Sequence, residues 1–305
     1  WYYNSSTYGP HLCMTHAFAK TYLNLDGTPY NDKKGDTYKT FAEETSGRDY
    51  RLNQTIRGAD YTCKDKEGVF VPTPANMTGH SLTGYQFTKY VMDDISFDGG
   101  RTNYNDVPIA RYAEVLLNYA EAKAELGEMN ENVWSKTIKP LRERSGVTSV
   151  YPSEADLYMV EYFQNRVTDP FILEVRRERG IELTMESIRF DDIIRWHQGE
   201  LFARPWMGLW IPATETPLDL NNDGTPDTMV TNDVRKTSTL NLLMIDNASE
   251  AGHKLSNGTS GNILPATALQ RNWHDYKYVR PVPATAIQEN PNLSQNPGWE
   301  KVYKK

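Results

Sequence analysis

One stretch of the sequence spaces oxygen-bearing side chains as a calcium-binding loop does. Asp219, Asn221 and Asp223 stand at alternate positions, and Gly224 follows at the sixth. Calcium takes about six to eight oxygen ligands, and glycine at the sixth position permits the sharp turn of such a loop. The Glu expected at the twelfth position is absent. The motif therefore predicts one structural Ca²⁺ held by Asp219, Asn221, Asp223 and Asp227, with an acidic surface turn as the alternative; no other cofactor is required.

A second group with possible chemistry is a run of glutamates. Glu174, Glu178 and Glu182 recur every four residues and so share one face of a predicted helix. A glycosidase needs two carboxylates across its substrate, which would make Glu178 a candidate acid or base. Interleaved arginines favour ion pairs instead, with Arg189 and Arg195 as the expected partners. Such a network would position helices rather than add much stability.

The overall composition excludes some classes of function. The net charge of -7 and the pI of about 5.5 argue against a general nucleic-acid binder, which would show a basic face. No apolar run approaches the roughly 18 residues of a membrane-spanning helix. Cys13 and Cys63 are the only cysteines, and they allow either one disulfide or two separate thiols.

Helical periodicity predicts the elements that position these groups. The segment 109–127 is predicted to be an amphipathic helix, with Pro108 before it and Gly127 at its end as start and stop signals. Its stripe of small residues would let a neighbouring helix approach closely; it consists of Ala113, Leu117, Ala120 and Ala124. Further helices are predicted at 132–146, 169–186 and 188–197.

The predicted fold class is mainly α, with tetratricopeptide-like helix pairs and a large loop-rich cap that binds the ligand. The whole chain, 1–305, is predicted to be a single domain. Its segments are a loop-rich cap at 1–105, helix pairs at 106–199, a loop-rich insertion at 200–279 and a C-terminal tail at 280–305. Prolines interrupt the tail, and only 284–289 allows a short helical turn.

Several ordered blocks resemble the SusD/RagB family, the glycan-binding lipoproteins of Bacteroidetes outer membranes. These blocks are MTHAFAKTYLNLDGTPY (14–30), SGRDYRLNQTI (46–56), RYAEVLLNYAEAKAELG (111–127), ILEVRRERGIELTMESIRFDDIIRW (172–196) and RPVPATAIQENPNLSQNPGW (280–299). In the second block, Tyr50 replaces the proline usual in the family. The resemblance covers the C-terminal part of such a protein, so the first half of a typical member is missing here.

The resemblance implies a binding protein rather than an enzyme. Its implied partners are an oligosaccharide, a SusC-like TonB-dependent transporter and the missing N-terminal half of the same protein. Its implied location is the cell outer membrane, where it would be surface-exposed and lipid-anchored through an N-terminal segment absent from this chain. A peptide-binding member, a protein-interaction scaffold without a glycan, and a glycosidase that uses Glu178 are the alternatives.

In this family, ligand contacts come from irregular segments rather than from the conserved helices. Tyr112 and Tyr119 are therefore assigned to packing. Aromatic faces stack against sugar rings, with polar neighbours for the hydroxyls. The predicted ligand-binding residues are Trp1, Tyr2, Tyr3, Tyr8, Tyr61, Phe70, Trp206 and Trp210. The first four alternate with small polar residues, although they would equally suit packing against the missing half.

Overall fold

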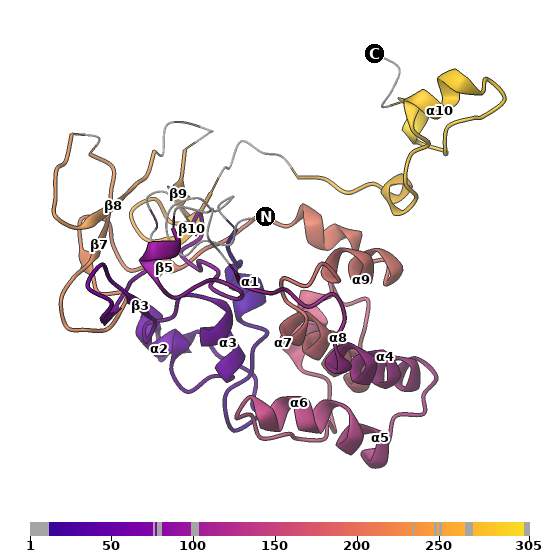
Figure 1. Cartoon of the computed structure of the whole chain (residues 1–305), viewed down its shortest axis with the longest axis horizontal. Coiled ribbons are helices and arrows are strands. Elements are labelled where there is room, and N and C mark those ends of the chain that lie inside the picture. The colour runs from indigo at the N-terminus through magenta and orange to yellow at the C-terminus, as the bar shows by residue number, and fades with distance from the viewer. Residues whose placement is uncertain are drawn as a thin grey trace. The chain divides into compact units, whose positions relative to one another are not determined.

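The computed structural model describes residues 12–75, 77, 81–98, 104–233, 235–246, 249, 252–265 and 271–301. The chain forms two compact units. Unit 1 consists of Trp1–Ser187 and Trp206–Leu269, and unit 2 of Ile188–Pro205 and Gln270–Lys305. Figure 1 shows the helices of both units and the small sheets of unit 1. The division of the sequence into a single domain with four segments stays a prediction.

The helical part of unit 1 is built around α4 (Tyr112–Glu125) and α8 (Pro170–Glu182), which pack along each other (Figure 1). Both helices were predicted from periodicity and are confirmed. The Asp169 side chain caps α8 and Pro170 begins it, as predicted. The small-residue stripe of α4 is buried, because it allows close approach to α8. The helix α7 (Leu157–Tyr162), which also packs on α8, was not predicted.

The predicted helix 132–146 is wrong as a single helix. The structure has α5 (Glu131–Lys136) and α6 (Ile138–Arg144), which meet at Thr137 with φ -122° and ψ -79°. Pro140 explains the break, since its ring would clash with the Lys136 carbonyl of a continuous helix and it has no N–H to donate. The predicted inward-facing residues of this region, Ile138, Leu141 and Val147, are buried.

The assignment of Tyr112 and Tyr119 to packing is wrong. Their exposed fractions are 73% and 47%. The reason is that α4 turns its alanine face to α8, and the two tyrosines lie off that face. The pairing of helices as tetratricopeptide repeats stays a prediction.

The rest of unit 1 consists of short helices and small sheets. Its first part contains α1 (His16–Ala19), α2 (Phe41–Thr45), α3 (Tyr50–Thr55) and η1 (Ile95–Phe97), with the pairs β1 (Lys33–Lys34)–β2 (Thr37–Tyr38) and β3 (Thr62–Lys64)–β4 (Phe70–Pro72). The predicted loop-rich insertion holds two three-stranded sheets. They are β5 (Trp210–Ile211)–β10 (Gly261–Leu264)–β9 (Lys254–Leu255) and β6 (Pro217–Leu218)–β7 (Thr228–Thr231)–β8 (Asn241–Met244).

These strands were not predicted because none exceeds four residues, too few for a clear alternation of apolar and polar side chains. Within the second sheet, β7 pairs antiparallel with β6 and parallel with β8, where Val230 lies opposite Leu243. All four residues of β7 are buried.

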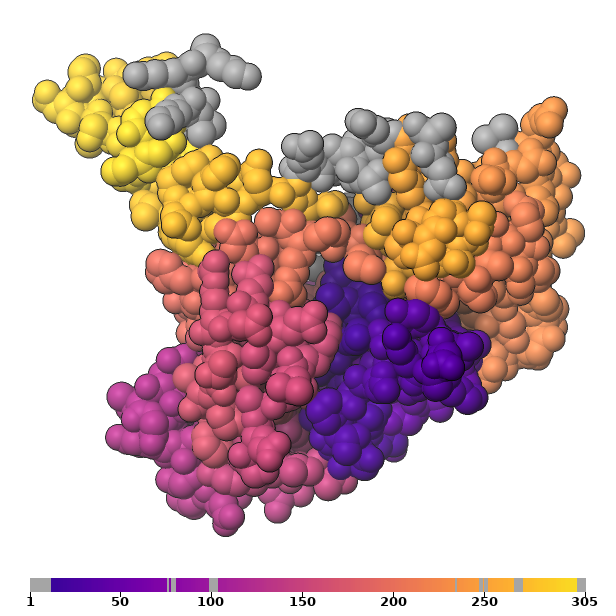
Figure 2. All heavy atoms as spheres, turned by 180° about the vertical axis from the view of Figure 1, so that it is seen from behind, coloured from indigo at the N-terminus to yellow at the C-terminus, as the bar shows by residue number. Residues whose placement is uncertain are grey.

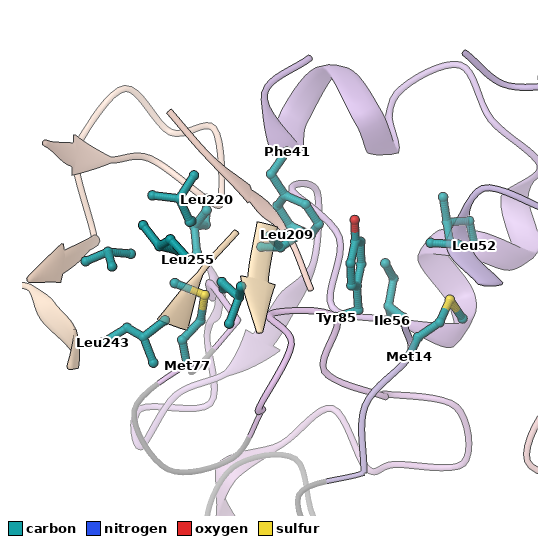
Figure 3. Packing of buried hydrophobic residues seen from close by; sticks show 14 of the residues in the cluster. Met14, Phe41, Leu52, Ile56, Met77, Tyr85, Leu209, Leu220, Leu243 and Leu255 are labelled. Atoms are coloured by element: carbon teal, nitrogen blue, oxygen red, sulfur yellow. The ribbon is translucent and has the colours of Figure 1, made fainter. Parts of the chain in front are cut away.

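A single hydrophobic cluster joins the first hundred residues to the two sheets. Figure 3 shows Phe41 and Tyr85 beside Leu209, although these residues are far apart in the sequence. Leu52 and Leu220 belong to the same cluster. The space-filling view agrees, with the indigo N-terminal part directly against the orange insertion (Figure 2). The cluster therefore holds the loops of the two segments in fixed positions.

Unit 2 is held together mainly by aromatic side chains. It contains α9 (Arg189–Arg195), η2 (Gly199–Ala203), η3 (Asp275–Tyr278), α10 (Ala284–Glu289) and η4 (Trp299–Lys301). The Phe202 ring lies 5.5 Å from that of Trp273, and the Trp299 indole donates to the Val279 carbonyl at 2.7 Å. The short turn predicted at 284–289 is confirmed as α10, and Trp299 packs within its own unit against Tyr276.

Buried ion pairs connect the helices of unit 1. The Arg142 side chain, 2% exposed, donates to Glu174 and to Glu178, and Arg51 Nη1 lies 2.7 Å from Glu182 Oε2. The ion pairing predicted for Glu178 and Glu182 is confirmed, with Arg51, Arg111, Arg142 and Arg144 as the partners in unit 1. The pairing with Arg189 and Arg195, which belong to unit 2, stays a prediction. The cluster joins the cations Arg51, Lys89, Arg111, Arg142 and Arg144 to the carboxylates Asp49, Glu174, Glu178, Glu182 and Glu186.

Of the two alternatives for the cysteines, the structure has two separate thiols. Cys13 and Cys63 do not form a disulfide with each other, and Cys63 is buried.

Candidate ligand-binding recess

The first wall of the candidate site is the N-terminus of α3. The Asp49 side chain caps this helix by accepting from the Arg51 amide, and Tyr50 is the first helical residue. Gly146 allows the Tyr50 ring to approach, since a Cβ there would lie 2.4 Å from Tyr50 Cε2 and φ is +78°. The Tyr50 side chain is supported on one side by Gly146 and yet remains 54% exposed.

The second wall comes from the residues before β3. The Tyr61 hydroxyl donates to Asp93 Oδ1 at 2.7 Å, and the Arg57 guanidinium lies 4.9 Å from the Tyr61 ring centroid. Burial raises the pKa of Tyr61, and the hydrogen bond to Asp93 raises it further, so the hydroxyl stays neutral. Both contacts fix the orientation of the Tyr61 ring.

An amide side chain lies between these walls. Asn53 Nδ2 donates to the Thr45 carbonyl at 3.2 Å. Within the described residues, the buried Asn53 Oδ1 has no hydrogen-bond partner. An unsatisfied buried acceptor is costly, so a conformation in which Asn53 Oδ1 gains a hydrogen-bond donor would be favoured.

The third wall is the acidic loop that the sequence singled out. Asp219 Oδ2 accepts from the Gly224 amide at 2.8 Å, and Asp223 Oδ1 accepts from the Thr225 amide at 2.8 Å. Asp227 Oδ2 accepts from the Leu220 amide at 2.8 Å. Backbone N–H groups therefore hold the carboxylates in place, and Gly224, with φ +87°, provides the sharp turn expected of it.

Together these walls enclose a recess of about 500 Å³, here called the α3 recess. Its volume lies in the range of small-ligand sites. It combines aromatic rings with amide and carboxylate groups, which is the set that stacks on sugar rings and hydrogen-bonds their hydroxyls. Its polar and aromatic lining includes Tyr50, Asn53, Asp60, Tyr61, Asn221 and Asp223.

Buried side chains anchor the elements that line the recess. Phe41, Leu52 and Leu220 belong to the hydrophobic cluster labelled in Figure 3, and each is adjacent in sequence to the lining residues or in the same helix turn. Packing of the core thus fixes the spacing of the walls.

A second recess, of about 330 Å³, is a weaker candidate. Arg51, Lys89, Arg111 and Arg144 line it, but each of these cations already pairs with Glu182 or Glu186. Because carboxylates already neutralise these cations, we assign this recess to the ion-pair cluster that joins the helices.

The structure separates the predicted ligand-binding aromatics. Tyr61 lines the α3 recess; Phe70 is 55% exposed on β4, and Trp206 is 41% exposed. The Trp210 ring stacks on Tyr38 with centroids 3.8 Å apart, so one of its faces is covered. Trp1, Tyr2, Tyr3 and Tyr8 lie outside the described residues.

Sequence reasoning missed Tyr50 as a candidate. It lies inside a block that resembles a family motif, and it occupies the first helical position, where proline is common. A bulky aromatic at a position that favours proline is the signal that would have pointed to it. The position of its ring depends on Gly146, which no local pattern connects to it.

The metal assignment stays a prediction. Among the described residues, no group of three or more His, Cys, Asp or Glu side chains is placed to hold a metal ion. Burial raises the pKa of Asp227, which disfavours its charged form in this conformation. In the same part of the chain, no helix is both long and apolar enough to cross a bilayer.

The fold and the recess define a class of protein: a helical scaffold that carries a ring-lined polar recess on short helices and loops. The chain belongs to the SusD family, whose model matches residues 2–299. No curated protein shows significant similarity to the chain.

Two solved structures are similar. One is a SusD-like protein from Bacteroides fragilis, with 22% identity and a TM-score of 0.59 over 93% of this chain and 46% of that chain. The other, from the same organism, is described as a SusD-like carbohydrate-binding protein. It has 24% identity and a TM-score of 0.54 over 92% of this chain and 48% of that chain. The likeness establishes the fold, and the chain spans about half the length of these structures.

Proposed function

We propose that this chain is the oligosaccharide-binding, C-terminal part of a longer cell-surface protein. In this proposal it binds glycan in the α3 recess and delivers it to a SusC-type TonB-dependent transporter of the outer membrane. The observation that carries the proposal is the recess itself, where the exposed Tyr50 ring lies beside amide and carboxylate groups. Membership of the SusD family supports it, as does a structural relative described as carbohydrate-binding.

The proposal extends to the rest of the protein. The missing N-terminal half would complete the tetratricopeptide-like helix pairs, and an N-terminal lipid would anchor the protein at the outer surface. The length of the solved relatives, about twice that of this chain, supports the presence of a further half of the protein. The protein would act without catalysis, in keeping with Glu178, whose two oxygens are both engaged by Arg51 and Arg142 at 1% side-chain exposure.

Replacing Tyr50 by Ala is expected to weaken glycan binding about tenfold, or about 1.4 kcal/mol. Stacking on an aromatic ring contributes roughly 1–3 kcal/mol per base in nucleic-acid complexes, and a sugar should lie at the lower end. A glycan array on the wild-type chain would identify a bound oligosaccharide, and calorimetry would then compare the variants. Tyr50→Phe, which keeps the ring, is the matched control and should retain most of the affinity.

Other outcomes would point to other functions. If Phe70→Ala or Trp206→Ala abolished glycan binding while Tyr50→Ala kept the wild-type affinity, the glycan would bind at the replaced side chain and not in the α3 recess. An absence of binding to every glycan would favour the protein-interaction scaffold, and binding to peptides alone would favour the peptide-binding alternative. Cleavage of the bound glycan, detected by chromatography, would contradict a purely binding role.

The acidic loop is proposed to hold one structural Ca²⁺ through Asp219, Asn221, Asp223 and Asp227. A cation that binds only the folded state stabilises it by about 2.7 kcal/mol at about 100 times its Kd. We therefore expect a higher melting temperature in calcium than in chelator. The difference should vanish in Asp219→Asn and persist in Asp233→Asn, a substitution outside the loop. A melting curve that is the same with calcium and with chelator would remove the proposal.

A further inference from the structure

The α3 recess is lined by three charged side chains among the residues that the structure describes. They are Arg48, Asp60 and Asp223. Asp60 and Asp223 are exposed and belong to two different walls, one before β3 and one in the acidic loop. The charge that a ligand meets in the recess therefore depends on where the Arg48 guanidinium points.

The positive charge of Arg48 is committed to backbone carbonyls away from the recess. Arg48 is 3% exposed, and its Nη2 donates to the Ala19 and Tyr22 carbonyls at 2.9 and 2.7 Å. Its Nη1 donates to the Glu44 carbonyl at 3.1 Å, and its Cζ lies 3.5 Å from the Tyr30 ring centroid. None of these partners lines the recess, so Arg48 does not present its charge to a ligand there.

The surroundings of the two carboxylates leave their negative charge uncompensated within the described residues. Asp223 Oδ1 accepts from the Thr225 amide at 2.8 Å, and its Oδ2 accepts from Asn221 Nδ2 at 3.1 Å, so both donors are neutral. Asp219 lies directly beside it, since Asp219 Oδ1 accepts from the Asp223 amide at 3.3 Å. Across the same described part of the chain, no lysine, arginine or histidine forms an ion pair with Asp60, Asp219 or Asp223.

An uncompensated carboxylate in a recess discriminates between ligands by their charge. Protein walls exclude part of the surrounding water, so the effective dielectric constant is lower and the electrostatic interaction is stronger than on an open surface. Anionic groups are repelled from such a site, and ammonium groups are attracted to it. Like-charge contacts are a general means by which binding sites reject unwanted partners. In the second recess, Lys89 and Arg111 already pair with Glu186, so this discrimination belongs to the α3 recess.

The proposed Ca²⁺ would not remove this charge. Asp60 lies outside the acidic loop, before β3, and is not one of the four proposed ligands of the ion. Its carboxylate would therefore meet a ligand in the same way with calcium and with chelator.

We propose that the α3 recess selects neutral and amino-bearing oligosaccharides, and that Asp60 and Asp223 exclude glycans with carboxylate or sulfate groups. The inference rests on the proposed function, because it names the class of glycan that the same recess binds. The Tyr50 ring would stack on a sugar of any charge, so the selection comes from the two carboxylates.

Calorimetry with derivatives of opposite charge would test the selection. The neutral oligosaccharide that binds most tightly on the array would be compared with two derivatives, in which one 6-hydroxyl is replaced by an amine or converted to a sulfate ester. The sulfated derivative should bind about tenfold more weakly than the amine, and Asp60→Asn or Asp223→Asn should each narrow this ratio. Asp233→Asn, which removes the same charge outside the recess, should leave the ratio unchanged. Equal affinity for the two derivatives would overturn the inference, as would a sulfated or uronate glycan as the tightest ligand on the array.

A probe that needs no glycan separates the failure of this inference from the failure of the proposed function. Ser46 lines the recess and is exposed, so Ser46→Cys in a Cys13→Ser background would place one reactive thiol there, since Cys63 is buried. Methanethiosulfonate reagents that carry an ammonium or a sulfonate group would report the charge around this thiol. Relative to a free thiol in solution, the ammonium reagent should react several-fold faster than the sulfonate reagent, and Asp60→Asn should reduce the difference.

The two measurements together assign any failure to one claim. Equal relative rates of the two reagents, in a protein that binds neutral glycans, would overturn the inference and leave the proposed function standing. Unequal rates in a protein that binds no glycan would contradict the proposed function and leave the negative charge of the recess standing.

Discussion

Replacing Arg142 by Met is expected to lower the free energy of unfolding by about 3–5 kcal/mol. The Arg142 side chain is 2% exposed, and its Nε lies 3.0 Å from Glu178 Oε2. It also pairs with Glu174. The substitution would remove the positive charge that lies between two buried carboxylates. Removing one partner of a buried ion pair destabilises a protein far more than an intact pair stabilises it.

Arg144 is the matched control, because it lies on the same helix and pairs with another carboxylate of α8. Its side chain is 55% exposed, and Glu182 keeps Arg51 and Arg111 as partners when Arg144 is removed. Solvent-exposed pairs contribute about 0–1 kcal/mol, so Arg144→Met should cost less than about 1 kcal/mol. Urea unfolding followed by circular dichroism would measure both variants. If both variants lost the same free energy of unfolding, burial of Arg142 could not be the cause of the loss.

Acid is expected to unfold the protein through the same cluster. Burial opposes the charged form of Glu182, but the charge of Arg51 and hydrogen bonds from Arg144 and Arg111 outweigh it and lower the pKa to about 2. The pKa values of Glu174 and Glu186 are also lowered, because their Arg and Lys partners outweigh burial in the same way. In the unfolded chain these groups would titrate near a pKa of about 4.3.

Because the folded-state pKa of Glu182 is the lower one, its contribution to stability is fully present above about pH 5. That contribution disappears as the pH falls from about 5 to about 2, and for Glu182 alone it amounts to about 3 kcal/mol. Urea unfolding at several pH values would measure how steeply the free energy of unfolding changes with pH. Glu182→Gln should flatten the slope in this window, whereas Glu143→Gln, on the exposed face of α6, should leave it unchanged. Stability that is constant down to about pH 3 would contradict this assignment.

The sequence predicted those parts of the structure that depend on neighbouring residues. The periodicity of 109–127 predicted α4, Asp169 and Pro170 predicted the start of α8, and the spacing of prolines in the tail allowed α10. The sharp turn at Gly224 was also predicted, because it depends on the backbone of that one residue. Such signals are local, since they follow from spacing on a helix, from a cap, or from the fixed backbone of proline.

The ion pairs and the recess were decided by tertiary structure. The sequence showed that Glu178 needs a cation, but only the fold brought Arg51 to it from 127 residues away. In the same way, Tyr50, Tyr61 and Asp223 line one recess because the hydrophobic cluster packs the first hundred residues against the two sheets. Contacts of this range leave no local spacing to detect. A sequence therefore states which side chains require partners, whereas the packing of distant segments determines which partners they obtain.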